Sequence, residues 1–508
     1  MTNVTNKLLN FRPIILICAN LILGILCTVT LIYSLNLYIF LGCAFFLVNI
    51  ITIVCFVINK NKKVYIALIV SLIITLIVCA RFSLIIFSNI NASDIGTVTI
   101  YGSIIKVNSI KVTDVGYVIN AYVEVLDGEL SGSVIQTYFN SSNLLHEGYK
   151  VEFSGVVNAL NFYANNYVNS KNLRYGVNYV CNNSNILNVD TNINNVFNYA
   201  KHLLYQRLSY SNAENYEFIF ALLTGDTNFI KDLTLNKFRD VGVAHIFAVS
   251  GLHIGFLYAF INLIFKPFKF NKVTKYVLTL VLLYLYVAFC GTTPSCLRAF
   301  IIIAVSSFSK AFGFKNDRLS SIFFSMVLVL TINSADLFNV GFYLSYLACL
   351  SLVFLTPKIE KLLNYILPQR VCKFVAPFIS AYVGTLPITN DFFLNSSLLS
   401  MLFNAFIVPL MSFVFILCFI SSVIIMLFSN ALFIMQISSF FVSLIVWYVN
   451  TFSFIVLKTT VLFSISTVFY YFGLVLCSGV INVKLKTVKI ISLVNFVIFL
   501  LVFLLINI

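Results

Sequence analysis

The chain has 508 residues, of which 60% are hydrophobic and 10% charged, and its mean hydropathy is +0.99. This composition excludes an ordinary soluble protein, because uncharged apolar runs long enough to span a bilayer recur throughout the sequence. The runs are continuous, whereas the strands of a membrane barrel alternate in hydrophobicity. We therefore predict a polytopic α-helical membrane protein.

The net charge is +15, which would by itself admit nucleic-acid binding, so its distribution matters more than its size. All 17 acidic residues lie between Asp94 and Asp391, whereas lysine and arginine occur mostly in short clusters between the apolar runs. Such clusters are typical of cytoplasmic loops. We interpret the charge as an orientation signal, with nucleic-acid binding as the alternative.

Residues 1–90 predict three transmembrane helices, with apolar runs at 13–33, about 37–58 and about 64–89. Basic residues precede the first run and separate the second from the third, so the N-terminus is expected to be cytoplasmic and residue 90 to lie outside. The first run lacks a cleavage site followed by a polar remainder. We expect an uncleaved anchor.

Residues 91–190 form the one block that resembles a soluble domain, and they predict a small extracytoplasmic β domain. Alternating segments separated by turn residues lie at 97–107, 117–126, 133–139 and 149–157. The pattern suits a five-stranded OB-type barrel. Single-stranded nucleic acid could stack there on Tyr163, Tyr167 and Tyr175, although packing is the usual role of such tyrosines.

Residues 191–230 are expected to form interfacial amphipathic helices. Apolar residues recur at helical spacing over 194–210, with basic side chains between them. A second helix over 214–224 is expected to end at Gly225, and Asp226 could cap the segment that follows.

The apolar stretch VGVAHIFAVSGLHIGFLY at 241–258 carries two of the four histidines. Ionisable residues at membrane depth mainly face protein or a water-filled cavity, so His245, Ser250 and His253 are candidate functional residues. We expect a crossing at 241–265 that Ser250 and Gly251 break or bend, which would direct both histidines into a cavity. The alternative is that neighbouring helices satisfy the imidazoles and Gly251 permits close packing.

Nine more apolar runs follow the central stretch in a predicted channel domain at 231–508. They lie at about 276–290, 297–312, 319–335, 341–356, 374–390, 398–428, 430–456, 459–480 and 488–507. The total of about thirteen crossings places the four basic clusters after residue 265 on the cytoplasmic side. The run at 398–428 is over-long and contains Pro409, so we expect a kink or a break there.

Other polar residues near the ends of these runs are candidates for a nucleic-acid path. Arg298 follows an outer loop and could meet phosphate, whereas snorkelling or a salt bridge to Asp226 or Asp336 are the alternatives. Pro294 and Ser295 could shape that loop or cap the next helix. The remaining candidates are a wall of Tyr343, Ser345 and Tyr346 and a polar ring of Asn390, Asn404 and Asp391, with packing and helix ends as alternatives.

The 12 cysteines lie almost all in apolar runs, so we interpret them as core residues. Cys290 and Cys296 flank a short loop and could pair. Two further functional classes are alternatives to a nucleic-acid path. Ser250 and His253, with Asp226 as orienting acid and His245 as second base, could serve an intramembrane hydrolase. A broken central helix could also serve a small-solute transporter, although no repeat relates the two halves.

Several segments resemble the ComEC family of competence proteins. ALLTGD at 221–226 and KFRDVGVAHIFAVSGLHIG at 237–255 resemble the family signature. Further matching segments are NFYANNYVNSKNLRYGV at 161–177, GTTPSCLRAF at 291–300, DLFNVGFYLSYLA at 336–348, GTLPITNDFF at 384–393 and NAFIVPL at 404–410. Together they cover roughly residues 90–480.

The resemblance implies a cytoplasmic-membrane channel that imports one strand of transforming DNA. Implied partners are the lipid bilayer, single-stranded DNA, a DNA receptor and separate nuclease outside, and an ATPase or single-strand-binding proteins inside. Many relatives append a metallo-β-lactamase-like domain, but the sequence has no His-x-His-x-Asp-His cluster and no phosphate-binding Gly-Lys-Ser/Thr loop. We therefore expect no catalytic, metal or cofactor site. Cys181 has no second cysteine in the β domain, which leaves a disulfide known from relatives in doubt.

Overall fold

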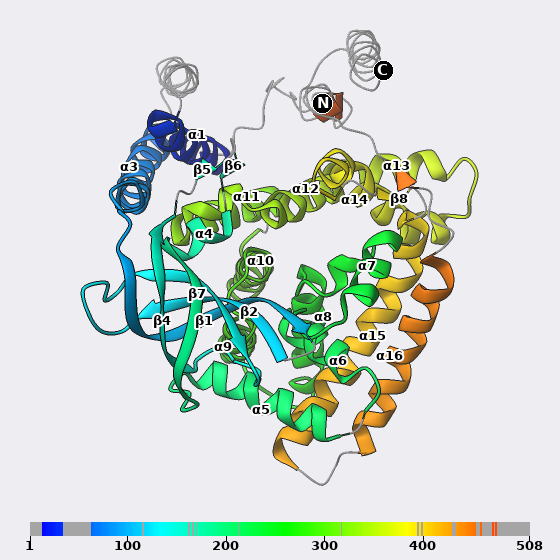
Figure 1. Cartoon of the computed structure of the whole chain (residues 1–508). Coiled ribbons are helices and arrows are strands. Elements are labelled where there is room, and N and C mark those ends of the chain that lie inside the picture. Colours follow the sequence, from blue (N-terminus) through cyan, green and yellow to red (C-terminus); the bar gives the residue numbers. More distant parts are fainter. Residues whose placement is uncertain are drawn as a thin grey trace.

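The structure is a computed structural model that describes most of residues 13–33 and 62–453. Short gaps occur at 114–115, 161–162, 165–166, 169, 212, 316, 394–395, 398–399 and 429–432, and brief pieces are described at 458–459, 470–471 and 473–474. The predicted runs at 37–58, 488–507 and most of 459–480 lie outside the described residues. The predicted fold class, a polytopic helical protein with one small β domain, is confirmed (Figure 1).

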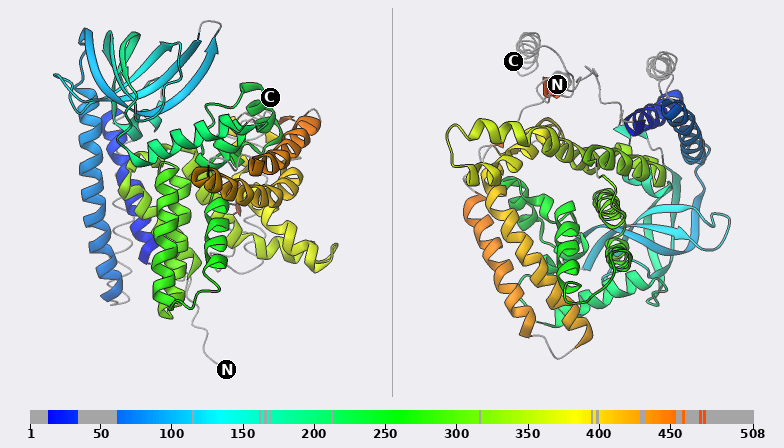
Figure 2. Two further views of the ribbon diagram at one scale, coloured as in Figure 1. Left: turned by 90° about the horizontal axis from the view of Figure 1, so that it is seen from below. Right: turned by 180° about the vertical axis from the view of Figure 1, so that it is seen from behind.

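Two long apolar helices open the described chain. Helices α1 (Pro13–Tyr33) and α3 (Lys62–Ile90) pack side by side, and Asn20 Nδ2 donates a hydrogen bond of 3.0 Å to Ser71 Oγ between them. An amide buried in an apolar helix pair needs such a partner. Both helices match the predicted runs closely, and α3 leads directly into the β domain (Figure 2).

The β domain is a closed five-stranded barrel with the order β1-β2-β3-β7-β4. All neighbouring strands are antiparallel except β3 and β7. The strands are β1 (Gly96–Thr113), β2 (Gly116–Val125), β3 (Val134–Ser141), β4 (Lys150–Ala159) and β7 (Val177–Asp190). Four of them were located by their alternation, whereas β7, which closes the barrel, was not.

The barrel core consists of the inward residues of these alternating strands. Phe139 and Phe153 are fully buried and meet edge to face at 5.1 Å between ring centroids. Cys181 is a free, buried thiol. A Cβ on Gly155 would lie 2.5 Å from Cys181 Sγ, so the glycine makes the space that the thiol fills.

Helix α4 (Ser170–Tyr175) precedes β7 within the barrel segment, whereas α5 (Val196–Tyr210) and α6 (Tyr216–Thr224) lead from β7 into the helical domain. Asn195 begins α5 by accepting hydrogen bonds from two backbone amides, as an N-cap residue does. Gly225 ends α6 in the left-handed conformation, as predicted. Residues Phe218–Thr224 are buried, so α6 is a core helix and the prediction of an interfacial helix there was wrong.

The central stretch is not one continuous crossing. Helix α7 (Asp232–Val241) ends at Gly242 with a φ of 79°, a single 3₁₀ turn η1 (Ala244–Ile246) follows, and α8 (Gly251–Ile264) begins after Ser250. The 14 residues of α8 are fewer than the roughly 20 that a bilayer requires. The predicted crossing at 241–265 is thus interrupted after Val241 as well as before Gly251, and only the second interruption was anticipated.

The remaining elements follow in chain order. They are α9 (Lys272–Phe289), α10 (Pro294–Phe312), α11 (Arg318–Ile332), η2 (Ser334–Phe338), α12 (Val340–Phe354), α13 (Thr356–Leu363), α14 (Gln369–Phe393), α15 (Ser400–Leu427) and α16 (Phe433–Phe452). Among the described residues, two small sheets have two strands each. One pairs β5 (Tyr163–Ala164) with β6 (Tyr167–Val168), and the other pairs β8 (Ser396–Ser397) with β9 (Lys458–Thr459). Helix α15 continues through Pro409, so the predicted alternative of a break was wrong.

Within the described part of the chain, six helices are long and apolar enough to cross a membrane, or seven if α12 and α13 count as one bent span. Helices α8 and α11 are apolar but shorter. Figure 1 views α3, α9 and α10 end-on and α15 and α16 lengthwise, and Figure 2 shows the same crossed arrangement. Helix length alone therefore does not assign α15 and α16 to the same direction of crossing as α3.

Candidate functional site

Arg298 is buried where three helices meet. It lies in the second turn of α10, only 6% of its surface is exposed, and its Nη1 donates hydrogen bonds to the Ser345 carbonyl oxygen and to Cys349 Sγ on α12. Its guanidinium carbon lies 5.7 Å from the centre of the Tyr346 ring, within the range of a cation–π contact. The Nε atom is buried without a hydrogen-bond partner.

Both predicted alternatives for Arg298 are wrong. A snorkelling arginine would be exposed, and this one is buried. Asp336 instead forms an ion pair with Arg174, and Asp226 accepts a hydrogen bond from the Asn228 amide. Among the described residues, no carboxylate lies within ion-pair distance of Arg298. The contacts of its guanidinium within the described part of the chain are thus a backbone carbonyl, a cysteine sulfur and an aromatic ring.

The start of α8 lies directly against this arginine. A Cβ on Gly251 would lie 3.0 Å from Arg298 Nη2, so the glycine allows α8 and α10 to approach closely. On the α12 side, the hydroxyls of Ser295 and Ser345 lie 3.2 Å apart. We refer to Gly251, Ser295, Arg298, Ser345 and Tyr346 as the Arg298 cluster, which joins residues from three of the predicted segments.

Ser250 and His253 form a helix cap. Ser250 Oγ accepts from the Leu252 amide at 3.3 Å, and His253 Nδ1 accepts from the Ser250 amide at 3.1 Å. This reciprocal arrangement is a capping box in which histidine replaces the usual Glu or Gln. The His253 ring is 4% exposed and packs against Phe415 at 4.6 Å. The ring nitrogen next to Ser250 thus binds its backbone, not its hydroxyl.

His245, Ser250 and His253 line one pocket with a volume of about 270 Å³. Its opposite wall comes from α15, through Val408, Met411 and Ser412. His245 is exposed, in the 3₁₀ turn before the helix. No residue of α10 lines this pocket, whereas Arg298 of α10 lies against Gly251 at the start of α8.

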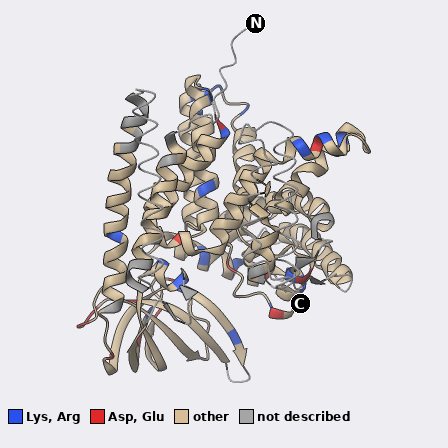
Figure 3. Ribbon diagram, turned by 90° about the horizontal axis from the view of Figure 1, so that it is seen from above, with Lys and Arg blue, Asp and Glu red and all other residues tan. Residues whose placement is uncertain are grey.

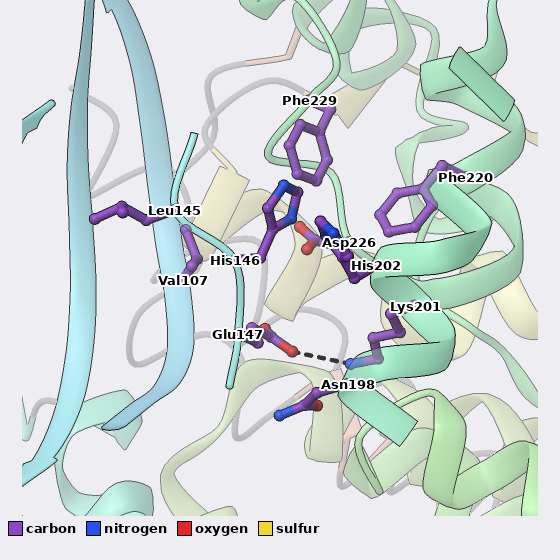
Figure 4. Close-up of a pocket in the computed structure, with 10 residues that line it drawn as sticks. All are labelled: Val107, Leu145, His146, Glu147, Asn198, Lys201, His202, Phe220, Asp226 and Phe229. Atoms are coloured by element: carbon purple, nitrogen blue, oxygen red, sulfur yellow. Dashed lines mark hydrogen bonds and ion pairs between the residues drawn. The ribbon is translucent and has the colours of Figure 1, made fainter. Parts of the chain in front are cut away.

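Asp226 belongs to a different place, between the barrel and α5 (Figure 4). Glu147 forms ion pairs with Lys106 at 2.6 Å and Lys201 at 3.0 Å, and His146 packs on His202 with ring centroids 4.5 Å apart. Sequence analysis missed this cluster because its members come from β1, a barrel loop and α5. The opposite charges in these segments were the only signal.

Burial and neighbouring charges shift the titration of this junction. Burial alone would raise the pKa of Glu147, but the two ammonium groups lower it to about 2. Burial, with help from His202, lowers the pKa of His146 to about 4. Burial raises the pKa of Asp226, although Lys106 opposes the effect. At neutral pH the junction therefore holds an ionised Glu147 beside a neutral imidazole.

A second junction ties the barrel segment to the loops beside α10. Arg174 in α4 pairs with the buried Asp336 and donates from Nη2 to the Thr292 carbonyl at 3.0 Å. Asn333 Nδ2 donates to the Arg174 carbonyl at 3.0 Å. The segment containing Arg174 was noted for its resemblance, but its partners lie more than a hundred residues away and could not be predicted. This junction brings α4 next to the loop that precedes Arg298.

The other predicted residues are scattered. Pro294 is buried at the first position of α10, and Tyr343 is half-buried in α12. The Asn390 and Asn404 amide oxygens are buried without a hydrogen-bond partner, and the Asp391 side chain lies outside the described residues. Tyr175 packs on Tyr122 at 5.2 Å, whereas the side chains of Tyr163 and Tyr167 are also outside the described part.

Cysteine and metal chemistry find little support in the described residues. Cys290 and Cys296 are free, so the possible disulfide between them is not formed. Their sulfur atoms contact the carbonyl oxygens of Leu223 at 3.5 Å and Val249 at 3.3 Å. No group of three or more His, Cys, Asp or Glu residues that could hold a metal occurs in the part that the structure describes.

Comparison with known proteins identifies the family. The model of the competence protein family matches residues 222–486, which is more than half of the chain. The chain belongs to the competence protein family. The matched region of this competence protein begins in α6 and includes the Arg298 cluster and both pocket-lining histidines of α8 and η1.

Two curated relatives show how far the similarity extends. This competence protein is 27% identical over 218 residues to ComE operon protein 3 of Bacillus subtilis, which covers 43% of this chain and 27% of that protein. It is 29% identical over 177 residues to the uncharacterized protein MG316 of Mycoplasma genitalium, which covers 34% of this chain and 43% of that protein. The match thus spans less than half of either relative. No solved structure matches the chain.

Proposed function

We propose that this multi-pass membrane protein is a channel that imports single-stranded DNA across the cytoplasmic membrane during natural transformation. The observation that carries the proposal is the Arg298 cluster in a member of the competence protein family. A buried guanidinium without a carboxylate is costly unless an anion arrives to neutralise it. A planar guanidinium binds phosphate through paired, charge-assisted hydrogen bonds, and phosphate is the anion that a DNA strand carries.

The neighbouring groups suit a moving strand better than a fixed ligand. The serine hydroxyls of the Arg298 cluster offer neutral hydrogen bonds, and Tyr346 offers an aromatic face. Single-stranded nucleic acid is bound through modest positive potential and stacking, with contacts weak enough to release it. His245 and the pocket beside α8 would extend the polar lining, and Asn390 and Asn404 would supply unpaired amide oxygens further along the chain.

The proposed orientation places the N-terminus in the cytoplasm and the barrel outside, following the basic clusters. The barrel would then receive the strand from a DNA receptor and a separate nuclease. An ATPase or single-strand-binding proteins would draw the strand inward, because the sequence offers no nucleotide-binding loop. We propose a non-catalytic role for the chain, since the Ser250–His253 geometry is that of a cap and does not support the hydrolase alternative.

The decisive experiment measures uptake of labelled DNA and the number of transformants in cells whose only copy carries a substitution. We expect Arg298→Ala to lower uptake by at least about tenfold, in keeping with the loss of one charge-assisted phosphate contact of about 1.5–3 kcal/mol. Arg239→Ala serves as the matched control, because Arg239 is exposed and its Nη1 donates a hydrogen bond to the neighbouring Asn236. Immunoblots of isolated membranes report the protein level.

Each outcome discriminates between parts of the proposal. Loss of uptake for Arg298→Ala at a normal membrane level, with Arg239→Ala unaffected, supports the Arg298 cluster as a point on the path. Normal uptake with Arg298→Ala, together with failure of the deletion strain, would keep the channel and remove the cluster from it. Normal uptake in the deletion strain would refute the channel itself.

A further inference from the structure

A short arm projects from the helical domain between two apolar helices. Helix α12 bends by 52° into α13, and the chain continues through 364–368 into α14. None of the α13 residues is buried, and residues 364–371 are all exposed. The arm stands out from the body on the side remote from the barrel (Figure 2). We define residues 356–374 as the α13 arm.

The arm combines exposed apolar and basic side chains. Leu362, Tyr365 and Ile366 are 65%, 80% and 82% exposed. The basic residues of the arm are all exposed, namely Lys358, Lys361, Arg370 and Lys373. Glu360 is its one acidic residue. Figure 3 shows this mixture of charges on the projecting helix. Apolar residues so exposed would be costly in water, and nothing in the described chain covers them.

We propose that the α13 arm lies in the headgroup layer of the same membrane and binds anionic lipids there. A helix with apolar residues on one face and lysines on the other inserts its apolar face at the boundary of headgroups and acyl chains. Its lysines and arginines then meet the negative surface of the cytoplasmic leaflet. The bend after α12 turns the chain from a crossing direction into one along the membrane surface.

The position of the arm favours a lipid surface over a soluble partner. Its two ends are fixed by α12 and by α14, of which α14 is a candidate span, so the arm cannot move far from the bilayer. Nucleic acid would account for the basic residues and for stacking on Tyr365, but not for the exposed Leu362 and Ile366. Charge complementarity and apolar exposure together identify anionic phospholipid as the occupant.

The experiment uses the single tryptophan of the chain. The full-length Trp447→Phe, Ile366→Trp variant carries one tryptophan in the arm. It is reconstituted into vesicles of phosphatidylcholine and phosphatidylglycerol at three to one, with and without brominated acyl chains. We expect a blue-shifted emission and several-fold stronger quenching by bromine than in the Trp447→Phe, Val112→Trp control. Val112 is 79% exposed at the barrel and should remain in water.

A second set of variants tests the role of the basic residues of the α13 arm. Replacing Lys358, Lys361, Arg370 and Lys373 by Gln in the Ile366→Trp protein should remove the dependence of quenching on phosphatidylglycerol. All four side chains are exposed, so we expect the substituted protein to keep its fold. Equal, weak quenching at positions 366 and 112 would overturn the proposal. So would quenching that ignores lipid charge, or an emission change caused by a single-stranded oligonucleotide in detergent without lipid.

Discussion

Ser250 and His253 illustrate how a residue pair that resembles a catalytic dyad can be structural. Both accept hydrogen bonds from backbone amides at the start of α8. Those amides would otherwise lack partners, since the first amides of a helix have none within it. The imidazole also fills space against Phe415. The same chemistry that would let histidine act as a base lets its neutral form accept a backbone hydrogen bond.

Substitution of Ser250 separates capping from catalysis. Ser250→Ala removes the acceptor for the Leu252 amide and should lower the free energy of unfolding by about 1 kcal/mol. Ser250→Asn retains a capping oxygen but no nucleophilic hydroxyl. Its free energy of unfolding should lie within a few tenths of a kcal/mol of that of the parent protein. Thermal unfolding in detergent and DNA uptake in cells are the two measurements. Equal loss of uptake in both variants, at unchanged stability, would restore the hydrolase alternative.

At the scale of the elements, helices α12 and α14 pack closely at Gly384. A Cβ on Gly384 would overlap Ser351 Oγ and lie 2.5 Å from Ser351 Cβ. The small residue thus sets the distance between the helices, as is usual in membrane proteins. Since α12 also carries Ser345 and Tyr346, this packing positions one side of the Arg298 cluster.

Gly384→Ala should therefore separate α12 from α14 and destabilise the protein by about 1–3 kcal/mol, the usual effect of overpacking. Ser351→Gly in the same chain should restore most of the loss, because it removes the overlapping hydroxyl. Gly255→Ala is the control, since a Cβ there meets nothing within 4 Å. The measurement is the midpoint of thermal unfolding in detergent. A Gly384→Ala midpoint equal to that of Gly255→Ala would contradict the packing argument.

Local sequence explains why elements were predicted with unequal success. Helices α9 and α10 begin and end near the ends of their apolar runs. In both cases a glycine with positive φ follows the helix, Gly291 after α9 and Gly313 after α10. The stretch after Val241 is equally apolar, but Gly242 adopts a left-handed conformation and a capping serine starts a new helix nine residues beyond it. Hydropathy alone does not reveal the glycine that ends one helix or the serine that begins the next.

At the scale of the whole molecule, the barrel is held by two polar junctions. One joins Glu147 to Lys106 and Lys201, and the other joins Arg174 to Asp336. Desolvated ion pairs fix orientation more than they add stability. The barrel thus keeps a defined position beside the loop before α10, which is where the proposed strand would enter the helical domain.

The first junction should loosen as pH falls. In the folded protein the pKa of His146 is lowered from 6.5 to about 4. Between these pH values His146 binds a proton when the barrel is undocked from α5 but stays neutral when it is docked. The stability of docking is complete above pH 6.5 and decreases down to about pH 4. Below about pH 4.5, Glu147 adds a second loss, because its folded pKa is about 2. The raised pKa of Asp226 acts in the opposite direction.

Hydrogen–deuterium exchange of the Leu145–Tyr149 peptide, corrected for the intrinsic exchange rate, measures this effect. Protection should decrease between pH 7 and pH 5 in the parent and change much less in His146→Gln, which cannot titrate. The Arg174–Asp336 junction is common to both proteins, so it cancels in the comparison. Identical pH dependence in the two proteins would show that His146 does not control docking.

The sequence by itself determined the class of molecule: a helical membrane protein with one small β domain, and a member of a family recognisable from short segments in a fixed order. Hydropathy and alternation carry that information because the bilayer and a barrel core both impose local, periodic demands on side chains. Only the tertiary structure decided which polar residues meet. Arg298 forms hydrogen bonds to groups 47 and 51 residues away in the sequence. Asp226 lies at the junction with the barrel and not beside Arg298. Such contacts depend on how helices pack, which no local pattern in one sequence specifies.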